Sequence, residues 1–401
     1  TLFQLNDLDP LVLTARCDAF SSDSPYMPLI EMVRSRLSLN GISPSEQISE
    51  LAIALSALGL DQPEALPLFA LLLSIEIEDE RKQVLNEMSG VRQRQRTQEL
   101  ILEALKTLAC DSPLLLIIED VHWADASTLE LLGRVNTLEL GNRVMLLIST
   151  RQELDTAWIS DKKPTKIILS QLISEESEAI IRAVASDKPL PYALVRQIGL
   201  RASGNPLFLE EITLSVLGSE YLTERESTWD LLQPFSAELV PNTMEAALMA
   251  RLDKLGESRT LLQIGATLGR EIRLDLLCAV APFNRRQIEK TIQRIVEEGL
   301  LIVADTAEKS YIFKHALVQD VAYQSLLLST RQQHHARIAD VLSNDYKQLG
   351  TQRPELLAHH LSGAHRYLDA AKMWLIAGAS AMQRSAVIEA CLLYTSPSPR
   401  D

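Results

Sequence analysis

Two adjacent carboxylates, Glu119 and Asp120, follow an apolar run within residues 114–127, LLLIIEDVHWADAS. The LLLII run is predicted to form a strand buried on both faces, as strands of a parallel sheet are. Ligands of open α/β sheets bind outside the carboxyl ends of the strands. A carboxylate there can hold Mg²⁺, and its neighbour can polarise an attacking water. The alternative is that the two acids only end a strand and cap the next helix.

Other side chains near this run could take part in the same chemistry. Arg151 follows the next predicted strand and should reach the same sheet edge, where a guanidinium can contact a phosphate and respond to its loss. Otherwise Arg151 is a surface arginine in a loop. Asp125 is placed to cap the helix that begins at Ser127. His122 and Trp123 are interpreted as packing residues.

The surrounding pattern alternates strands and helices. Strands are predicted at residues 11–15, 114–118 and 144–148, with helices at residues 28–37, at 97–108 and from Ser127 onward. Residues 40–95 are a mixture of helix and loop. Strand, helix and strand joined by short connections are typical of an α/β layered domain. Strands are predicted to stop after about residue 165.

The second half of the chain is mostly helical. Helices are expected at residues 174–185, with Ser174 as the N-cap, and at 191–202 and 206–217. Helices near residues 243–298 precede two β-like runs at 300–304 and 311–314, which together are typical of a winged helix-turn-helix. From Leu317 to residue 390 the pattern is helical. Small residues at contact spacing there, such as Ala370 and Ala377, favour helix-pair repeats.

Composition excludes several classes of function. The chain has 401 residues, is 46% hydrophobic and carries a formal net charge of −14, which argues against broad nucleic-acid binding. No apolar stretch reaches the ~20 residues that a membrane-spanning helix needs, and no signal peptide is visible at the start. Four widely spaced cysteines form no metal-binding pair, so they are interpreted as reduced thiols of a cytoplasmic protein.

The run at residues 114–127 resembles the Walker B segment of the STAND branch of AAA-like ATPases, in the group that accompanies nucleotide cyclases, LuxR-type regulators and some Ser/Thr kinases. Further segments resemble that family in the expected order. They are residues 17–28 (CDAFSSDSPYMP) after the second strand, 148–153 (ISTRQE) at the sensor strand, 202–211 (ASGNPLFLEE) in the lid and 313–326 (FKHALVQDVAYQSL) in the winged helix.

The resemblance implies an ATP/ADP site with Mg²⁺. Glu119 takes the Mg²⁺-ligand position, Asp125 a supporting metal position, Asp120 the water-polarising position, and Arg151 the sensor position. Many relatives have Asp where this chain has Glu119.

Two residues of the second half complete the implied site. Pro206 would press its ring on the adenine, although Gly204-Asn205-Pro206 also simply turns the chain into a helix. His315 would reach the β-phosphate of bound ADP. The usual relatives follow this His with Asp, whereas Ala316 follows it here.

The predicted fold is α/β: an AAA-like P-loop NTPase sheet without its first strand and P-loop, then a helical lid, a winged helix and the start of TPR-like helices. The predicted domains are residues 1–165 (nucleotide-binding core), 166–235 (lid), 236–330 (winged helix), 331–390 (helical repeats) and 391–401. The last segment, CLLYTSPSPRD, breaks the helical pattern and resembles a translated sequencing adapter.

The phosphate-binding loop of such ATPases, G-x-x-x-x-G-K-[ST], does not occur in the 401 residues. In the family it precedes the strand at residues 11–15 by one helix, and residues 1–9 would be the tail of that helix. The chain is therefore expected to be an N-terminally truncated piece. It should bind ATP weakly or not at all and should not hydrolyse it.

The predicted function is an ATP-binding and ATP-hydrolysing signalling switch of a multidomain regulator, with attachment to a cyclase left open. Its expected partners are the nucleotide, proteins that bind the C-terminal repeats, and other copies in a nucleotide-dependent oligomer, but neither a membrane nor, directly, DNA. One alternative is a DNA-binding regulator that uses Arg285, Arg286, Lys290 and Arg294 of residues 284–299. Another is a non-catalytic scaffold.

Arg92, Arg94 and Arg96 form either a solvated charged face or a source of a trans-acting arginine finger.

Overall fold

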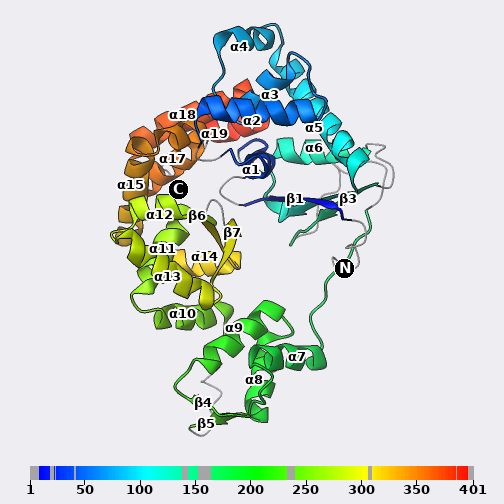
Figure 1. The fold of residues 1–401 in the computed structure, drawn as a ribbon. Coiled ribbons are helices and arrows are strands. Elements are labelled where there is room, and N and C mark those ends of the chain that lie inside the picture. The colour runs from blue at the N-terminus through cyan, green and yellow to red at the C-terminus, as the bar shows by residue number, and fades with distance from the viewer. Residues whose placement is uncertain are drawn as a thin grey trace. The chain divides into compact units, whose positions relative to one another are not determined.

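The computed structural model describes residues 9–18, 22, 24–39, 42–137, 143–151, 164–232, 240–305, 309–384 and 386–395. The chain divides into two compact units: Thr1–Pro164 with Ala339–Asp401, and Thr165–Ile338 (Figure 1). Most of the helix tail predicted at residues 1–9, and residues 152 and 153 of the sensor segment, lie outside the described residues. The division into smaller domains stays a prediction.

A parallel sheet forms the centre of the first unit. Its strands are β1 (Leu11–Arg16), β2 (Leu114–Glu119) and β3 (Val144–Ile148), in the order β1-β2-β3. The three strands predicted from apolar runs are thus confirmed, each within one residue. Buried parallel strands need apolar side chains on both faces, and that requirement makes these runs recognisable.

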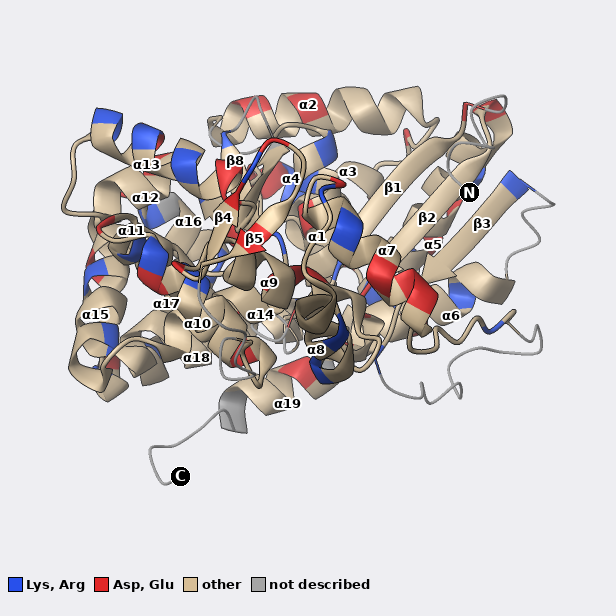
Figure 2. Cartoon of the chain, turned by 90° about the horizontal axis from the view of Figure 1, so that it is seen from below, with Lys and Arg blue, Asp and Glu red and all other residues tan. Residues whose placement is uncertain are grey.

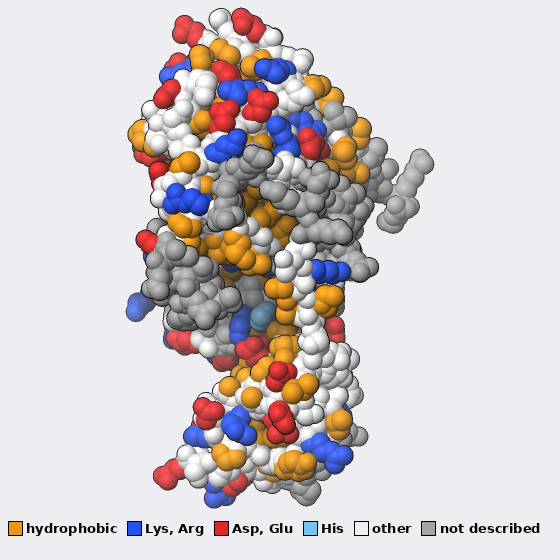
Figure 3. Space-filling model, turned by 90° about the vertical axis from the view of Figure 1, so that its right-hand side faces the viewer, with side chains coloured by type: hydrophobic (Ala, Val, Ile, Leu, Met, Phe, Trp, Pro, Cys, Tyr) orange, Lys and Arg blue, Asp and Glu red, His pale blue; other side chains and the backbone are white. Residues whose placement is uncertain are grey.

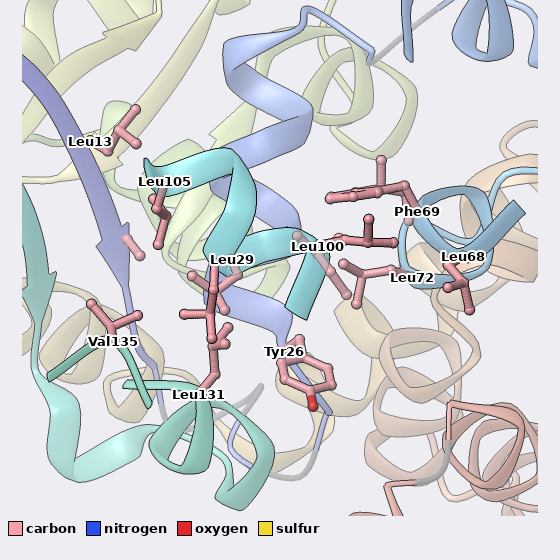
Figure 4. Close-up of a cluster of buried hydrophobic side chains, with 14 of the residues drawn as sticks. Leu13, Tyr26, Leu29, Leu68, Phe69, Leu72, Leu100, Leu105, Leu131 and Val135 are labelled. Carbon is pink, nitrogen blue, oxygen red and sulfur yellow. The ribbon is translucent and has the colours of Figure 1, made fainter. Parts of the chain in front are cut away.

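Helices cover one face of this sheet. The helices α1 (Met27–Arg36), α5 (Gly90–Asp111) and α6 (Ala126–Thr137) pack against the sheet, and α2 (Pro44–Ala57), α3 (Ala65–Leu72) and α4 (Asp79–Asn86) follow α1 in the chain, with α3 packed on α2, α4 and α5. Leu13 of β1 packs with Leu29, Leu105 and Val135 from α1, α5 and α6 in one buried cluster (Figure 4). The connections β1–β2 and β2–β3 advance in the same direction along the sheet. Right-handed crossovers therefore place both sets of helices on the same face.

The opposite face of the sheet is apolar and partly open. Val12, Leu115 and Met145 are aligned across the three strands, and side chains two residues apart share a face, so Ile117 and Leu147 continue this surface. Val12 is 44%, Met145 57% and Leu147 44% exposed. Figure 2 shows the strands side by side and almost free of charged residues along their length, and Figure 3 shows hydrophobic side chains reaching the molecular surface.

The end of the chain folds with the first unit. Helix α15 (Leu328–Asn344) leads into α16 (Lys347–Gln352), α17 (Pro354–Gly363), α18 (Tyr367–Gln383) and α19 (Val387–Thr395). Helix α18 buries small residues, including Ala370 and Ala377, as the predicted helix contacts require. Helix α19 continues past residue 390, where the helical pattern was predicted to break, and ends at Thr395.

The second unit begins with α7 (Ser174–Val184), α8 (Tyr192–Ala202) and α9 (Pro206–Leu217), followed by a hairpin of β4 (Leu222–Glu224) and β5 (Trp229–Leu231). The prediction that strands stop after residue 165 is therefore wrong, because runs of three residues carry too little pattern to be recognised. The N-cap of α7 is Ile173 rather than Ser174, and the Glu176 carboxylate accepts the Ile173 backbone N–H at 3.0 Å.

The rest of this unit combines helices with a small antiparallel sheet. The elements are α10 (Met244–Lys254), α11 (Ser258–Leu268), β6 (Glu271–Arg273), α12 (Leu274–Val280), α13 (Arg285–Glu297), β7 (Leu301–Asp305), β8 (Ser310–Phe313) and α14 (Ala316–Gln324). The strand order is β6-β8-β7. These helices and the β7–β8 hairpin follow the expected order, while the names lid and winged helix stay predictions.

Gly204 sets the entry into α9. Its φ of +73° lies in the left-handed region, and a Cβ atom there would lie 2.4 Å from the backbone oxygen of Leu172. The Leu172 backbone N–H donates to the Gly204 carbonyl at 2.9 Å, so the two segments approach closely. Asn205 then caps α9 by accepting the Phe208 N–H at 3.1 Å, which makes Pro206 the first helical residue.

Candidate functional site

Glu119 ends the central strand and forms an ion pair with a residue that the sequence did not single out. Its partner is Arg16, the last residue of β1, which lies opposite Glu119 in the parallel register. Arg16 Nε is 2.7 Å from Glu119 Oε2, and both side chains are partly exposed. In the sequence Arg16 is recognisable as a charged residue directly after an apolar run. Only the register of β1 against β2 shows that it pairs with Glu119.

Asp120 and Arg151 meet at the same edge. Residues 119–123, here called the acid turn, comprise the end of β2, Asp120 and the short 3₁₀ helix η2 (Val121–Trp123). Asp120 has a φ of 53°, and its backbone N–H donates to the Ser149 hydroxyl at 3.1 Å. Arg151 Nε lies 3.8 Å from Asp120 Oδ1, and the arginine side chain is 68% exposed. Glu119, Asp120 and Arg151 therefore lie at one carboxyl edge of the sheet.

Asp125 is buried at the start of α6, with only 2% of its surface exposed. Its Oδ1 accepts the backbone N–H groups of Tyr26 at 3.0 Å and Thr128 at 2.8 Å, and its Oδ2 accepts the Thr128 hydroxyl at 2.6 Å. Asp125 thus caps α6, one of the two roles that the sequence left open, and also fixes the chain entering α1. Its supporting role toward a metal stays a prediction.

The buried carboxyl of Asp125 makes stability depend on pH. Its pKa is raised from 3.8 to about 6, mainly by burial and to a smaller extent by the nearby Glu389, although the hydrogen bonds from Thr128 and Tyr26 oppose the rise. Between these two pKa values the folded chain holds a proton that the unfolded chain has lost, so stability falls as the pH rises through this range. Compared with D125N, the wild type should lose about 2 kcal/mol of unfolding free energy between pH 4.5 and 7.5, measured by urea titration. Parallel pH profiles of the two proteins would contradict this expectation.

Pro206 and His315 belong to the second unit. Pro206 is exposed at the first turn of α9, and His315 is the half-buried N-cap residue of α14. Within the described residues the His315 Nε2 has no hydrogen-bond partner. Burial, followed by the positive charge of Lys314, lowers the pKa of His315, which favours the uncharged imidazole at neutral pH.

One ion pair joins α9 to the segment that carries His315, and a second joins α9 to α10. The Glu210 carboxylate pairs with Lys314, and Glu211 pairs with Arg251 of α10. The Glu211 and Arg251 side chains are 1% and 7% exposed, and Arg251 also donates to the Glu298 carbonyl. Glu210 lies one helical turn after Pro206 on α9. Both acids lie within the ASGNPLFLEE segment, where no local pattern indicates either ion pair.

The acid turn suits a magnesium ion that is shared with a nucleotide. Within the described ranges, no group of three or more His, Cys, Asp and Glu side chains is placed to hold a metal ion. Mg²⁺ at nucleotide sites takes only one or two carboxylates and completes its shell with phosphate oxygens and water. Glu119 and Asp120 are two carboxylates at the sheet edge that could serve this purpose, although Glu119 already has a cationic partner in Arg16.

The prediction that Arg92, Arg94 and Arg96 form a solvated charged face is wrong for Arg94 and Arg96. Arg96 is 17% exposed and pairs with Glu64, Glu99 and Glu103, while Arg94 is 18% exposed and pairs with Glu130. Arg92 is exposed. Arg94 and Arg96 therefore help to hold α5 against α6 and α3, because Glu130 lies in α6 and Glu64 is the N-cap residue of α3, whereas Glu99 and Glu103 belong to α5 itself.

Comparison with known proteins supports a nucleotide-binding module. Residues 1–148 match the model of the family described as "AAA ATPase domain". An uncharacterized protein of Rhizobium meliloti (strain 1021) is 26% identical over 352 residues, which cover 86% of this chain and 33% of that protein. The chain thus spans about a third of the length of this relative. In the described ranges no helix combines the length and apolarity needed to cross a membrane. The region that contains the parallel sheet and the acid turn is thus similar to the AAA ATPase domain, a nucleotide-binding ATPase module.

Proposed function

We propose that the chain is the nucleotide-operated switch of a STAND-type ATPase, acting in the cytoplasm within a longer signalling protein. The observation that carries this proposal is the meeting of Glu119, Asp120 and Arg151 at one carboxyl edge of a sheet that matches the AAA ATPase domain. Two acids and a guanidinium at that position have the chemistry needed beside a triphosphate and its metal ion.

Each side chain has a distinct role in this proposal. Asp120 polarises the water that attacks the γ-phosphate, and Glu119 contributes to the Mg²⁺ site. The bound Mg²⁺ neutralises phosphate charge. Arg151 is close to Asp120, and a γ-phosphate would compete with that carboxylate for the guanidinium. Loss of the phosphate would return Arg151 to Asp120, so the pair can report which nucleotide is bound.

The open face of the sheet supports a phosphate-loop strand beyond β3. A parallel strand beside β3 that connected to β1 would run back across the sheet, opposite to the two existing crossovers. A right-handed connection would then place its helix on the face that carries Val12, Met145 and Leu147. That helix would cover the exposed apolar side chains, and its strand would bring a phosphate-binding loop to the edge that holds the acid turn.

Pro206 and His315 supply the remaining nucleotide contacts in the proposal. The ion pair Glu210–Lys314 holds α9 against the residue next to His315, and Glu211–Arg251 holds α9 against α10, which packs on α14, so both contact residues belong to one packed group. Pro206 would face the adenine, and the uncharged His315 imidazole would donate a hydrogen bond to the β-phosphate of ADP. Repacking of this group between ATP and ADP would be the output of the switch.

Nucleotide binding by the natural chain, extended upstream to include its phosphate loop, tests this function. We expect Mg²⁺-dependent binding of ADP in isothermal titration and a loss of about tenfold or more in affinity for H315A, since a charge-assisted hydrogen bond contributes about 1.5–3 kcal/mol. R286M, at an exposed position of α13, is the control and should bind normally. No ADP binding by the extended wild type would refute the function.

The two alternatives have less support. Helix α13 buries Ile288, Ile292 and Ile295, and its Arg285 pairs with Glu289 at 3.1 Å. That arrangement serves packing inside the unit and does not single out DNA. A scaffold role through the C-terminal helices is compatible with the switch, and an upstream loop without its Lys would favour it over ATP hydrolysis.

A further inference from the structure

A buried carboxylate near the end of the chain reaches the helix that follows the acid turn. Glu389 of α19 is 1% exposed, and its Oε1 accepts the backbone N–H of Ser127 at 2.7 Å. Ser127 lies in the first turn of α6 and is itself fully buried. Because the first N–H groups of a helix have no partner inside the helix, a carboxylate there satisfies a donor and interacts favourably with the helix dipole.

Other polar contacts hold the C-terminal helices in the same place. Arg353 Nη1 lies 3.0 Å from Glu31 Oε1 of α1, and Arg34 of α1 donates to the Gln352 side chain at 3.1 Å. Arg384 donates to the Ser74 hydroxyl just after α3. Three elements of the core thus contact α16 to α19 at separate points. Arg384 also lines a small pocket together with Tyr26, Arg94 and Thr97 of the core.

Two carboxylates accept backbone N–H groups at the start of α6. Asp125 takes the Thr128 N–H and the Tyr26 N–H, while Glu389 takes the Ser127 N–H. Asp125 belongs to the core itself, whereas Glu389 is supplied only when α19 is docked. The acid turn directly precedes this capped turn in the chain, so the cap restrains the backbone that carries Asp120.

We propose that the C-terminal helices are a built-in partner of the nucleotide module, and that Glu389 is a positioning residue which orders the first turn of α6, and with it the acid turn, when these helices dock. Movement of the helical repeats, for instance on binding another protein, would then remove a cap from α6. The proposal that the C-terminal helices dock on the core depends only on these contacts. The proposal that docking affects ATP hydrolysis depends also on the proposed function.

Hydrogen exchange on the 401-residue chain tests the contact without nucleotide. In E389A we expect exchange at the start of α6 to accelerate about tenfold or more, whereas E389Q, which keeps an oxygen acceptor, should stay closer to the wild type. D369N is the matched control, since Asp369 is a partly exposed acid of the same C-terminal helices that pairs with Arg366 and Lys372. Unchanged exchange at residues 126–130 in E389A would overturn the role of Glu389.

A charge swap separates docking from a general loss of folding. E31R and R353E should each accelerate exchange in α17 and α18 and at the start of α6, because each places like charges 3.0 Å apart. The double variant E31R/R353E restores opposite charges at this pair and should recover part of the protection, since the second partner of Arg353, Glu355 at 3.5 Å, is still lost. Failure of the double variant to improve on both single variants would contradict docking at this surface.

Discussion

Replacing Arg251 by methionine is expected to lower the unfolding free energy of the chain by about 3–5 kcal/mol, because the change leaves a buried carboxylate without its partner. Glu211 is 1% exposed, and within the described residues its Oε1 already has no hydrogen-bond partner, so loss of Arg251 removes its only cation. The Glu298 carbonyl loses a donor as well. Urea unfolding followed by circular dichroism measures the change.

Two companion variants make this result specific. R285M removes an arginine that is 59% exposed and pairs with Glu289 along α13, and it should cost at most about 0.5 kcal/mol. The double variant E211M/R251M replaces both buried charges by apolar side chains and should recover a large part of the lost stability. Equal effects of R251M and R285M would show that the buried pair is not an important contact between α9 and α10.

On the proposed function, Asp120→Asn should lower ATP hydrolysis at least 100-fold in a form of the chain extended by a phosphate loop, while nucleotide affinity changes by less than about threefold. Asn preserves the size of the side chain and tolerates the left-handed backbone of residue 120, whose φ is 53°. The backbone N–H bond to Ser149 is unaffected by the substitution. What disappears is the negative charge that can polarise water.

The control for this experiment is D61N, because Asp61 is an exposed carboxylate of the same unit outside the acid turn. Single-turnover hydrolysis and titration with a fluorescent nucleotide separate the chemical step from binding. If D120N hydrolyses ATP at the wild-type rate, Asp120 is not the water-polarising group, whereas loss of binding would show instead that the substitution disturbs the site as a whole.

Local pattern accounts for much of the fold. The strands β1, β2 and β3 were predictable because buried parallel strands require continuous apolar runs, and α9 was predicted with both ends correct because Asn205-Pro206 and Gly218 are strong boundary signals. The strand β6 was missed because Glu271-Ile272-Arg273 has only one apolar residue. It is a strand because β8 offers it an edge, which is tertiary information.

Part of the candidate site was also predictable from the sequence pattern. Glu119, Asp120 and Arg151 could be placed at one edge because parallel strands end on the same side of a sheet. Arg16 could not be paired with Glu119 without the register of β1 against β2. The contact between Glu389 and Ser127 joins residues 262 positions apart, and no local pattern specifies such a partner.

The first unit is discontinuous, since Thr1–Pro164 packs with Ala339–Asp401 and the second unit lies between them in the sequence. During synthesis, at about 5–20 residues per second, the ribosome needs on the order of ten seconds or more to deliver the last helices after the sheet has emerged. During that interval the sheet and α1 to α6 lack the contacts that the last helices provide. Emergence of the helices after Ala339, rather than emergence of the first half, therefore sets the earliest moment at which the first unit can complete its packing.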